Sequence, residues 1–120
     1  MKHAPIVTNH LAKSEDLNHH GTLYAGRIAE WFVEAGFMAA ASYVSTRNFV
    51  CVKIHDMVFQ HPVYPGEVVC FTGEVTEAGT SSMRTKVRLT VQENCILEGF
   101  ATFVYVDTEG KPTPHGIKIE

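Results

Sequence analysis

Only one stretch of this 120-residue chain is long enough to form a substantial helix, and it runs from about residue 18 to residue 45. The turn residues Gly21 and Thr22 precede it, and Thr22 is of a type that caps a helix start by accepting a backbone N–H bond. At about 100° per residue, one face of this helix is apolar or small, as close packing against a sheet requires. That face consists of Ala25, Ile28, Ala29, Phe32, Ala35, Gly36, Ala39, Ala40 and Tyr43.

The opposite face of the helix does not stay polar, as a solvated face would. It carries Arg27, Glu30, Trp31, Glu34, Phe37, Met38 and Ala41, and no further charge follows until Arg47. Arg27 and Glu30 stand at i,i+3 and are expected to form a surface ion pair. Glu34 has no basic partner at helical spacing. We therefore expect a second molecule to cover the apolar residues of this face, and we interpret Glu34 as a candidate functional acid.

After the helix the sequence alternates with period two, as half-buried strands do. The pattern predicts strands over 49–59, 67–76, 82–92 and 96–106, and a shorter run over 5–11 predicts one strand before the helix. The order is β-α-β-β-β-β with hairpin-length connections. We predict an α+β domain in which one long central helix is wrapped by a curved antiparallel sheet. The edge strands of such a sheet favour at least a homodimer.

Composition narrows the class of protein. At 120 residues with a net charge of −3, we expect one domain over 1–120, in which about 108–120 form a loosely packed tail. Scattered Lys and Arg predict neither a nucleic-acid nor a membrane-surface partner. The sequence has no signal-like apolar run and no stretch of ~18 apolar residues, so no membrane span is expected. Three cysteines without CxxC spacing (Cys51, Cys70 and Cys95) predict buried or half-buried thiols in the reducing cytoplasm.

The histidines give no metal site. His55 and His61 flank a strand end with Asp56 between them, but no ligand-spacing motif accompanies them, so none is predicted. His19 and His20 lie next to the helix entrance, where they would either contact a substrate or remain exposed loop residues.

Six short motifs, in the same order, resemble the hotdog-fold acyl-CoA thioesterases, and most closely the YciA-type acyl-CoA hydrolases. The motifs span most of the chain. They are Asp16-Leu17-Asn18-His19-His20-Gly21, Tyr24-Ala25-Gly26, Glu34-Ala35-Gly36, the stretch 52–59 with Pro62-Val63 and Gly66-Glu67, Gly79-Thr80-Ser81-Ser82, and Val106 to Pro112.

The resemblance implies hydrolysis of acyl-CoA to a free acid and CoA, with no cofactor beyond the CoA of the substrate. It implies that Glu34 activates water or accepts the acyl group, and that Asn18 orients water or the carbonyl. Backbone N–H groups near Tyr24, Ala25 and Gly26, at the positive helix end, would polarise the carbonyl. The remaining candidates are an acyl pocket of Trp31, Phe37 and Met38 that desolvates Glu34, and CoA contacts at His61, Thr80, Ser81 and Ser82.

The acid of this sequence departs from the family pattern, where Asp is usual. Counting from Gly21 aligns the acid with Val33, whereas counting back from Phe59 aligns it with Glu34. A shift of one residue turns a helical side chain by ~100°. Glu34 is assigned because Val33 has no acid–base chemistry, and Glu30 is the fallback.

Helix geometry adds a constraint of its own. Gly26 and Glu34 are separated by roughly 12 Å along a helix axis, at ~1.5 Å per residue, so they cannot both touch one thioester carbon. We therefore predict a site shared between subunits, with a homodimer as the minimal unit and a tetramer or hexamer as the assembly. Two other functions remain open, an enoyl-thioester hydratase or dehydratase of the same fold and a non-catalytic acyl-CoA-binding module. Against the hydratase or dehydratase, the sequence lacks the His-x-x-x-x-Pro-Gly helix entrance of those enzymes. Against a binding module that acts as the sensor half of a regulator, it shows no appended DNA-binding helix pair.

Overall fold

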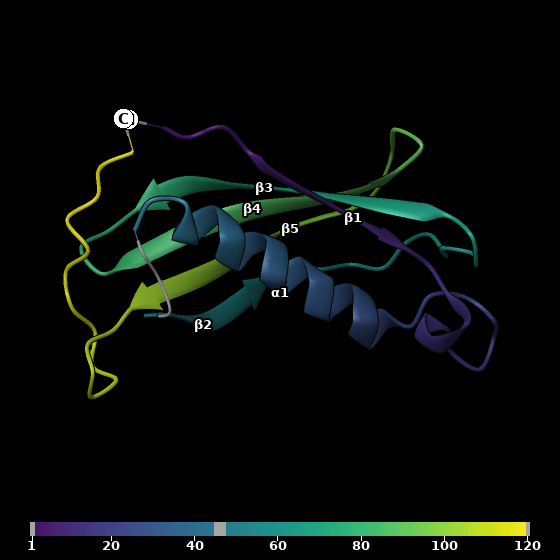
Figure 1. Cartoon of the computed structure of the whole chain (residues 1–120), viewed down its shortest axis with the longest axis horizontal. Coiled ribbons are helices and arrows are strands. Elements are labelled where there is room, and N and C mark those ends of the chain that lie inside the picture. Colours follow the sequence, from purple (N-terminus) through teal and green to yellow (C-terminus); the bar gives the residue numbers. More distant parts are fainter. Residues whose placement is uncertain (1, 45–47, 120) are drawn as a thin grey trace.

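A computed structural model describes residues 2–44 and 48–119 of the chain. Within these ranges a single α-helix lies on one face of a five-stranded antiparallel sheet (Figure 1). The helix is α1 (Ala25–Ala41). The strands are β1 (Ile6–Leu11), β2 (Phe49–His55), β3 (Val68–Ala78), β4 (Ser82–Val91) and β5 (Asn94–Tyr105), and a short 3-10 helix, η1 (Ser14–Asp16), follows β1. The sheet order is β1-β3-β4-β5-β2. The predicted α+β architecture of one helix against an antiparallel sheet is confirmed.

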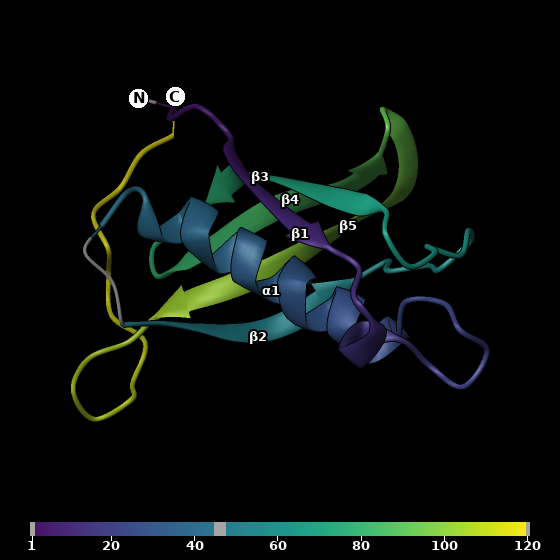
Figure 2. The same ribbon diagram turned by 45° about the vertical axis from the view of Figure 1, so that its right-hand side comes forward.

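The two edge strands come from the two sides of the helix in sequence. β1 pairs antiparallel with β3, and β2 pairs antiparallel with β5, so the three hairpin-linked strands form the centre (Figure 2). The turn between β4 and β5 consists of Gln92 and Glu93, whose φ angles are 50° and 71°. Two left-handed residues are what a tight two-residue hairpin requires. The strands predicted over 82–92 and 96–106 are therefore closer together than expected, since β4 ends at Val91 and β5 begins at Asn94.

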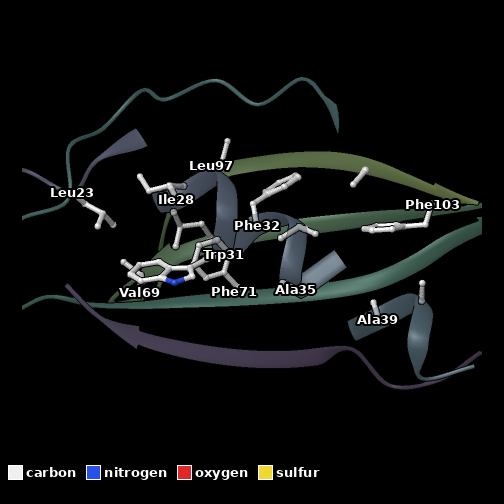
Figure 3. Close-up of a cluster of buried hydrophobic side chains, with 14 of the residues drawn as sticks. Leu23, Ile28, Trp31, Phe32, Ala35, Ala39, Val69, Phe71, Leu97 and Phe103 are labelled. Carbon is white, nitrogen blue, oxygen red and sulfur yellow. The ribbon is translucent and has the colours of Figure 1, made fainter. Parts of the chain in front are cut away.

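Small residues bring α1 close to the sheet. A Cβ atom on Gly73 of β3 would lie 2.8 Å from the Ala35 carbonyl oxygen, and one on Gly36 would lie 2.8 Å from Thr85 Oγ1. Phe32, Phe71 and Phe103 are fully buried around this approach (Figure 3). The apolar face predicted for the helix is confirmed, except that Ala25 at its start is exposed.

Trp31 belongs to this core and not to an uncovered face. Its side chain is 9% exposed and lies in the buried cluster beside Val69 and Phe71 (Figure 3). Its indole stacks on His10 of β1 with ring centroids 4.2 Å apart. The prediction that a second molecule must cover Trp31 is wrong, because β1 runs beside the helix and covers the indole. Phe37 is half-covered by the edge of Phe103, and Met38 remains 37% exposed. The apolar surface left open is therefore smaller than expected.

Two element boundaries differ from the predictions. Thr22 does not cap α1, because its N–H and hydroxyl groups bond Asn18 and the cap position is taken by Tyr24, which makes no side-chain cap bond. The strand predicted over 49–59 ends at His55, since Asp56 takes a φ of 54° that an extended strand cannot accommodate. The stretch predicted to be helical up to about residue 45 is shorter in the structure, where α1 ends at Ala41; residues 45–47 lie outside the described residues.

The segment after β5 is attached more firmly than its composition predicts. Thr113 N–H donates to the Tyr105 carbonyl at 2.9 Å, and His115 N–H donates to the Thr80 carbonyl at 3.1 Å. Ile117 and Ile119 pack against the core. Residues 112–119 therefore run across the end of the sheet, where Figure 1 shows them in yellow.

The cysteine prediction holds for one thiol only. Cys70 is half-buried, whereas Cys51 and Cys95 are exposed, and all three are free. Cys51 is exposed because it lies on edge strand β2, most of whose residues are exposed to solvent. No helix among the described residues has the length and apolar character needed to cross a bilayer.

Candidate functional site

The loop before α1 is organised by the side chain of Asn18. Its Oδ1 atom accepts the N–H bonds of His20 at 2.8 Å and Thr22 at 3.2 Å, and its Nδ2 atom donates to Thr22 Oγ1 at 3.1 Å. The Asn18 N–H also donates to the Thr22 carbonyl at 2.7 Å. Gly21 takes a φ of 80° within this turn. The amide of Asn18 is thus fixed in position at the mouth of the helix.

A buried carboxylate clamps the same loop to the helix. Asp16 is 4% exposed, accepts the Lys13 N–H at 3.0 Å, and pairs with Arg27 Nε at 3.2 Å. Arg27 also pairs with Glu30 at 3.3 Å, which confirms the predicted i,i+3 ion pair. The role of Asp16 was not predicted from the sequence. No local signal reveals it, because Asp16 and Arg27 lie on either side of the turn and meet only after it forms.

Two backbone donors point out of the helix entrance. The first bonds into the helix are those of the Arg27 and Ile28 N–H groups to the Tyr24 carbonyl, at 3.0 and 3.1 Å. Within residues 2–44 and 48–119, the N–H groups of Ala25 and Gly26 donate to no acceptor. The Tyr24 ring lies over Gly26, where a Cβ atom would come 2.9 Å from Tyr24 Cζ. These orphan donors carry the positive end of the helix dipole.

An open pocket of about 270 Å³ lies beside the orphan donors. It is lined by the loop before α1, the first turn of α1, and the segment that follows β2. Leu23 N–H donates to the Val63 carbonyl at 2.8 Å and so holds that segment against the helix entrance. The pocket brings together three residues predicted from separate motifs, Asn18, Ala25 and His61.

Glu34 does not reach this pocket. Its side chain is exposed about two helical turns further along α1, and it forms no ion pair or hydrogen bond with any residue of the described ranges. Glu30 is also exposed and is engaged with Arg27. In one chain, the helix entrance and the predicted acid are therefore separate, as the spacing of about 12 Å requires.

The β3–β4 hairpin lies far from the helix entrance. It holds Thr80, Ser81 and Ser82 at one end of the molecule, while the loop before α1 lies at the other end (Figure 1). All three backbone carbonyl groups accept hydrogen bonds within the chain. The His115 N–H donates to Thr80, the Tyr105 N–H to Ser81, and the Gly79 N–H to Ser82. The structure does not bring these residues together with His61 in one chain. Among the described residues, no three His, Cys, Asp or Glu side chains come together as metal ligands would.

Comparisons with known proteins agree with this architecture. YciA of Salmonella typhimurium, an acyl-CoA thioester hydrolase, is 27% identical over 118 residues, which covers 91% of this chain and 88% of that protein. The acyl-CoA thioester hydrolase YkhA of Bacillus subtilis, described as uncharacterized, is 29% identical over 119 residues, which covers 94% of this chain and 69% of that protein.

Solved structures show the same fold. A hexameric thioesterase of Yersinia pestis superposes with a TM-score of 0.83 at 28% identity, covering 89% of this chain and 91% of that chain. An acyl-CoA hydrolase of Staphylococcus aureus, solved with butyryl-CoA and CoA, gives a TM-score of 0.81 at 26% identity over 92% of this chain and 68% of that one. A hexameric hotdog-fold thioesterase of Campylobacter jejuni gives a TM-score of 0.81 at 26% identity, covering 89% of this chain and 86% of that chain.

The expected hotdog fold is thereby confirmed. Residues 20–95, more than half of the sequence, match the family described as the Thioesterase superfamily. The chain belongs to the thioesterase superfamily.

Proposed function

We propose that this protein hydrolyses acyl-CoA thioesters to free acids and CoA, at a site completed by a second subunit. The observation that carries the proposal is the helix entrance. It presents two unpaired backbone donors and a fixed amide beside a pocket, yet the acid that would activate water is about 12 Å away on the same helix. Family membership and relatives named as acyl-CoA thioester hydrolases support this reaction.

The pocket at the helix entrance suits the thioester carbonyl. The N–H groups of Ala25 and Gly26 would donate to its oxygen, and these hydrogen bonds would strengthen as the oxygen gains negative charge. Asn18 Nδ2 gives one hydrogen to Thr22 Oγ1, which leaves its second hydrogen for water or for the carbonyl. These donors are fixed before substrate arrives, so their orientation adds no reorganisation cost to the reaction.

The second subunit would supply Glu34. Its carboxylate takes a proton from the water that attacks the carbonyl carbon, and a tetrahedral oxyanion forms. The C–S bond then breaks, and the proton passes to the departing CoA sulfur. Direct attack by the carboxylate, through a mixed anhydride that water then cleaves, uses the same placement. Either route requires the partner's acid beside this chain's pocket.

The edge strand β2 is the surface through which we expect two chains to pair. It hydrogen-bonds to β5 on one side, and it carries Val50, Val52 and Ile54, which are 45%, 57% and 45% exposed. Antiparallel pairing of two β2 strands across a two-fold axis continues the sheet and places the two helices side by side in opposite directions. Each Glu34 then approaches the partner's helix entrance, and Phe37 and Met38 become covered as the wall of an acyl pocket.

Two further proposals follow from the same pairing. The opposed helices bring His61 of one subunit toward Thr80, Ser81 and Ser82 of the other, so that these residues contact one CoA between them. Relatives that form hexamers support assembly of the dimers into a hexamer.

The test combines product analysis with chain mixing. Free-thiol release from short acyl-CoAs is expected, whereas loss of crotonyl-CoA absorbance without thiol would indicate a hydratase, and neither signal would indicate a binding module. Glu34→Ala and Asn18→Ala chains, each impaired on its own, should regain some of the activity when mixed, because one of the mixed sites contains both intact residues. No regain despite demonstrated subunit exchange would exclude a shared site.

A further inference from the structure

A second pocket lies on the face of the sheet that α1 does not cover. Along β4, buried Met83, Thr85 and Val87 face the helix, so Arg84 and Lys86 between them project from the opposite face. A pocket of about 340 Å³ opens there, at the lower end of the ~300–1,000 Å³ typical of small-molecule sites. It is lined by His55, Glu77, Ser82, Arg84 and Thr102, together with the hairpin residues Ala78 and Gly79.

Arg84 is the unusual member of this pocket. Its Nε atom is buried and donates to no acceptor within the described residues, and its guanidinium lies 4.3 Å from the centroid of the Phe100 ring. Glu77 is its cross-strand neighbour on β3, yet the two side chains form no ion pair. Stacking places the guanidinium against Phe100 of β5, and Arg84 as a whole is half-buried. A charged side chain whose buried Nε–H has no acceptor is costly, which points to an acceptor that the chain itself does not provide.

The other cations of the same strand differ from Arg84. Lys86 Nζ and Arg88 Nε lie 3.5 and 3.8 Å from the Glu98 carboxylate, and Arg88 also donates to Cys95 Sγ at 3.5 Å. The positive charges of Lys86 and Arg88 are therefore balanced by Glu98 of the neighbouring strand β5. Arg84 alone of the three is left for an external anion, and Arg88 offers a matched control on the same face.

The neutral groups around Arg84 complete a set of donors. Thr102 is its cross-strand neighbour on β5, and the Thr102 hydroxyl shares a hydrogen bond of 3.1 Å with His55 Nε2. The Ser82 side chain lies at the hairpin end of the pocket. A planar guanidinium flanked by hydroxyl and imidazole groups matches the several oxygens of a phosphoryl group. Glu77 at the rim carries the opposing charge and limits affinity.

We propose that this pocket binds a phosphoryl group, with Arg84 as the charged donor and the Thr102 and Ser82 hydroxyls as neutral donors. The phosphoryl group has two possible sources, a free phosphate compound or the nucleotide end of CoA, and only the second source rests on the function proposed above. Binding on this face is separate from the helix entrance, which lies against the other face of the sheet (Figure 2).

Calorimetric titration of the whole protein with inorganic phosphate and with adenosine 3′,5′-bisphosphate, at constant ionic strength, tests the site without any turnover. Arg84→Gln should weaken binding at least about tenfold, since a charge-assisted pair is lost. Arg88→Gln should change affinity less than about twofold, and Glu77→Gln should tighten binding a few-fold. Equal losses in the two arginine variants, or no saturable binding by the unmodified protein, would overturn the proposal.

A kinetic comparison separates the two sources. If CoA supplies the phosphoryl group, Arg84→Gln raises KM for butyryl-CoA with kcat unchanged, and it leaves KM for the 3′-dephospho analogue unaltered. If the ligand is a free phosphate compound, both KM values stay constant while the titrations still distinguish the variants. Should Arg84→Gln fail to fold, as judged by circular dichroism, Thr102→Val and Glu77→Gln decide the matter through opposite shifts in phosphate affinity. Shifts in the same direction, or none, would contradict the site.

Discussion

The two halves of the candidate active site are built in opposite ways. The helix entrance is tied down within one chain, since the Asn18 side chain makes several hydrogen bonds and Asp16 is 4% exposed beneath Arg27. The middle of the same helix is open, with Glu34 exposed and unpaired within the described ranges. The adjacent edge strand β2 exposes Val52 by 57%.

Folding of a single chain therefore provides only one half of the candidate site. The donors that must be held rigidly are fixed by local turns and a buried ion pair. The carboxylate needs a water-excluding environment to act as a base near neutral pH. In the proposed function, assembly would provide that environment, because the single chain leaves Glu34 in contact with solvent. Substitutions in each half test whether the fixed entrance and the open acid have these separate roles, and the largest effect is expected at the acid.

Glu34→Gln should lower kcat by about 100-fold or more, because a general base is lost while the shape of the side chain is kept. Acyl-CoA binding, measured by titration with a non-hydrolysable analogue, should remain within a few-fold. Glu30→Gln is the matched control, since it removes an exposed carboxylate one turn earlier that pairs with Arg27. A large loss in Glu30→Gln with activity retained in Glu34→Gln would move the acid to Glu30.

Val52→Asp should disrupt the pairing of β2 strands by placing a charge at the proposed interface. We expect a smaller species by light scattering and a fall of specific activity of roughly tenfold or more on dilution, because dissociation separates Glu34 from the partner's entrance. Val7→Asp is the control, since Val7 lies on the other edge strand and is also 57% exposed. Dilution-dependent loss in Val7→Asp alone would place the catalytic interface at β1.

Most of the fold follows from the sequence, and most of the missed features come from long-range contacts. Sequence runs located the strands of the described residues, and the period-two pattern reflects burial where alternate residues face the helix, as in β4. In β2 most residues are exposed, so there the alternation does not reflect burial. The misplacement of Trp31 has a clear reason. A helical wheel assigns a face but does not say how far the sheet wraps around it, and His10 covers the indole from β1.

The site shows the same division between local and distant signals. Asn18 and Ala25 belong to two motifs that lie close together in the sequence, and the structure places both beside one pocket with His61. Asp16 escaped notice because its partner Arg27 becomes a neighbour only once the intervening turn has formed. The unpaired Arg84 could not be foreseen either. An alternating strand predicts which face a side chain occupies but not whether its charge finds a partner.

Asn18→Ala separates a catalytic role from a structural one. We expect kcat to fall about tenfold through loss of an orienting donor, together with a loss of about 1 kcal/mol in the free energy of unfolding as turn hydrogen bonds disappear. Thr22→Val removes the hydroxyl partner of the same amide and should reproduce the stability loss alone. If both variants lose stability while kcat is unaltered in each, Asn18 is a turn residue and nothing more.

His10→Ala should give the smallest effect on stability and activity. It tests the contact between β1 and the face of α1 that carries Trp31. Loss of the stack on Trp31 should cost about 1 kcal/mol in urea unfolding, the usual size of an aromatic pair. kcat and the order of preference among acyl chain lengths should not change, because β1 and Trp31 form core on this side while Phe37 and Met38 remain toward the partner. A shifted acyl preference in His10→Ala would show that Trp31 lines the acyl pocket from beneath. The tightly packed half of the molecule would then contribute to specificity as well as to stability.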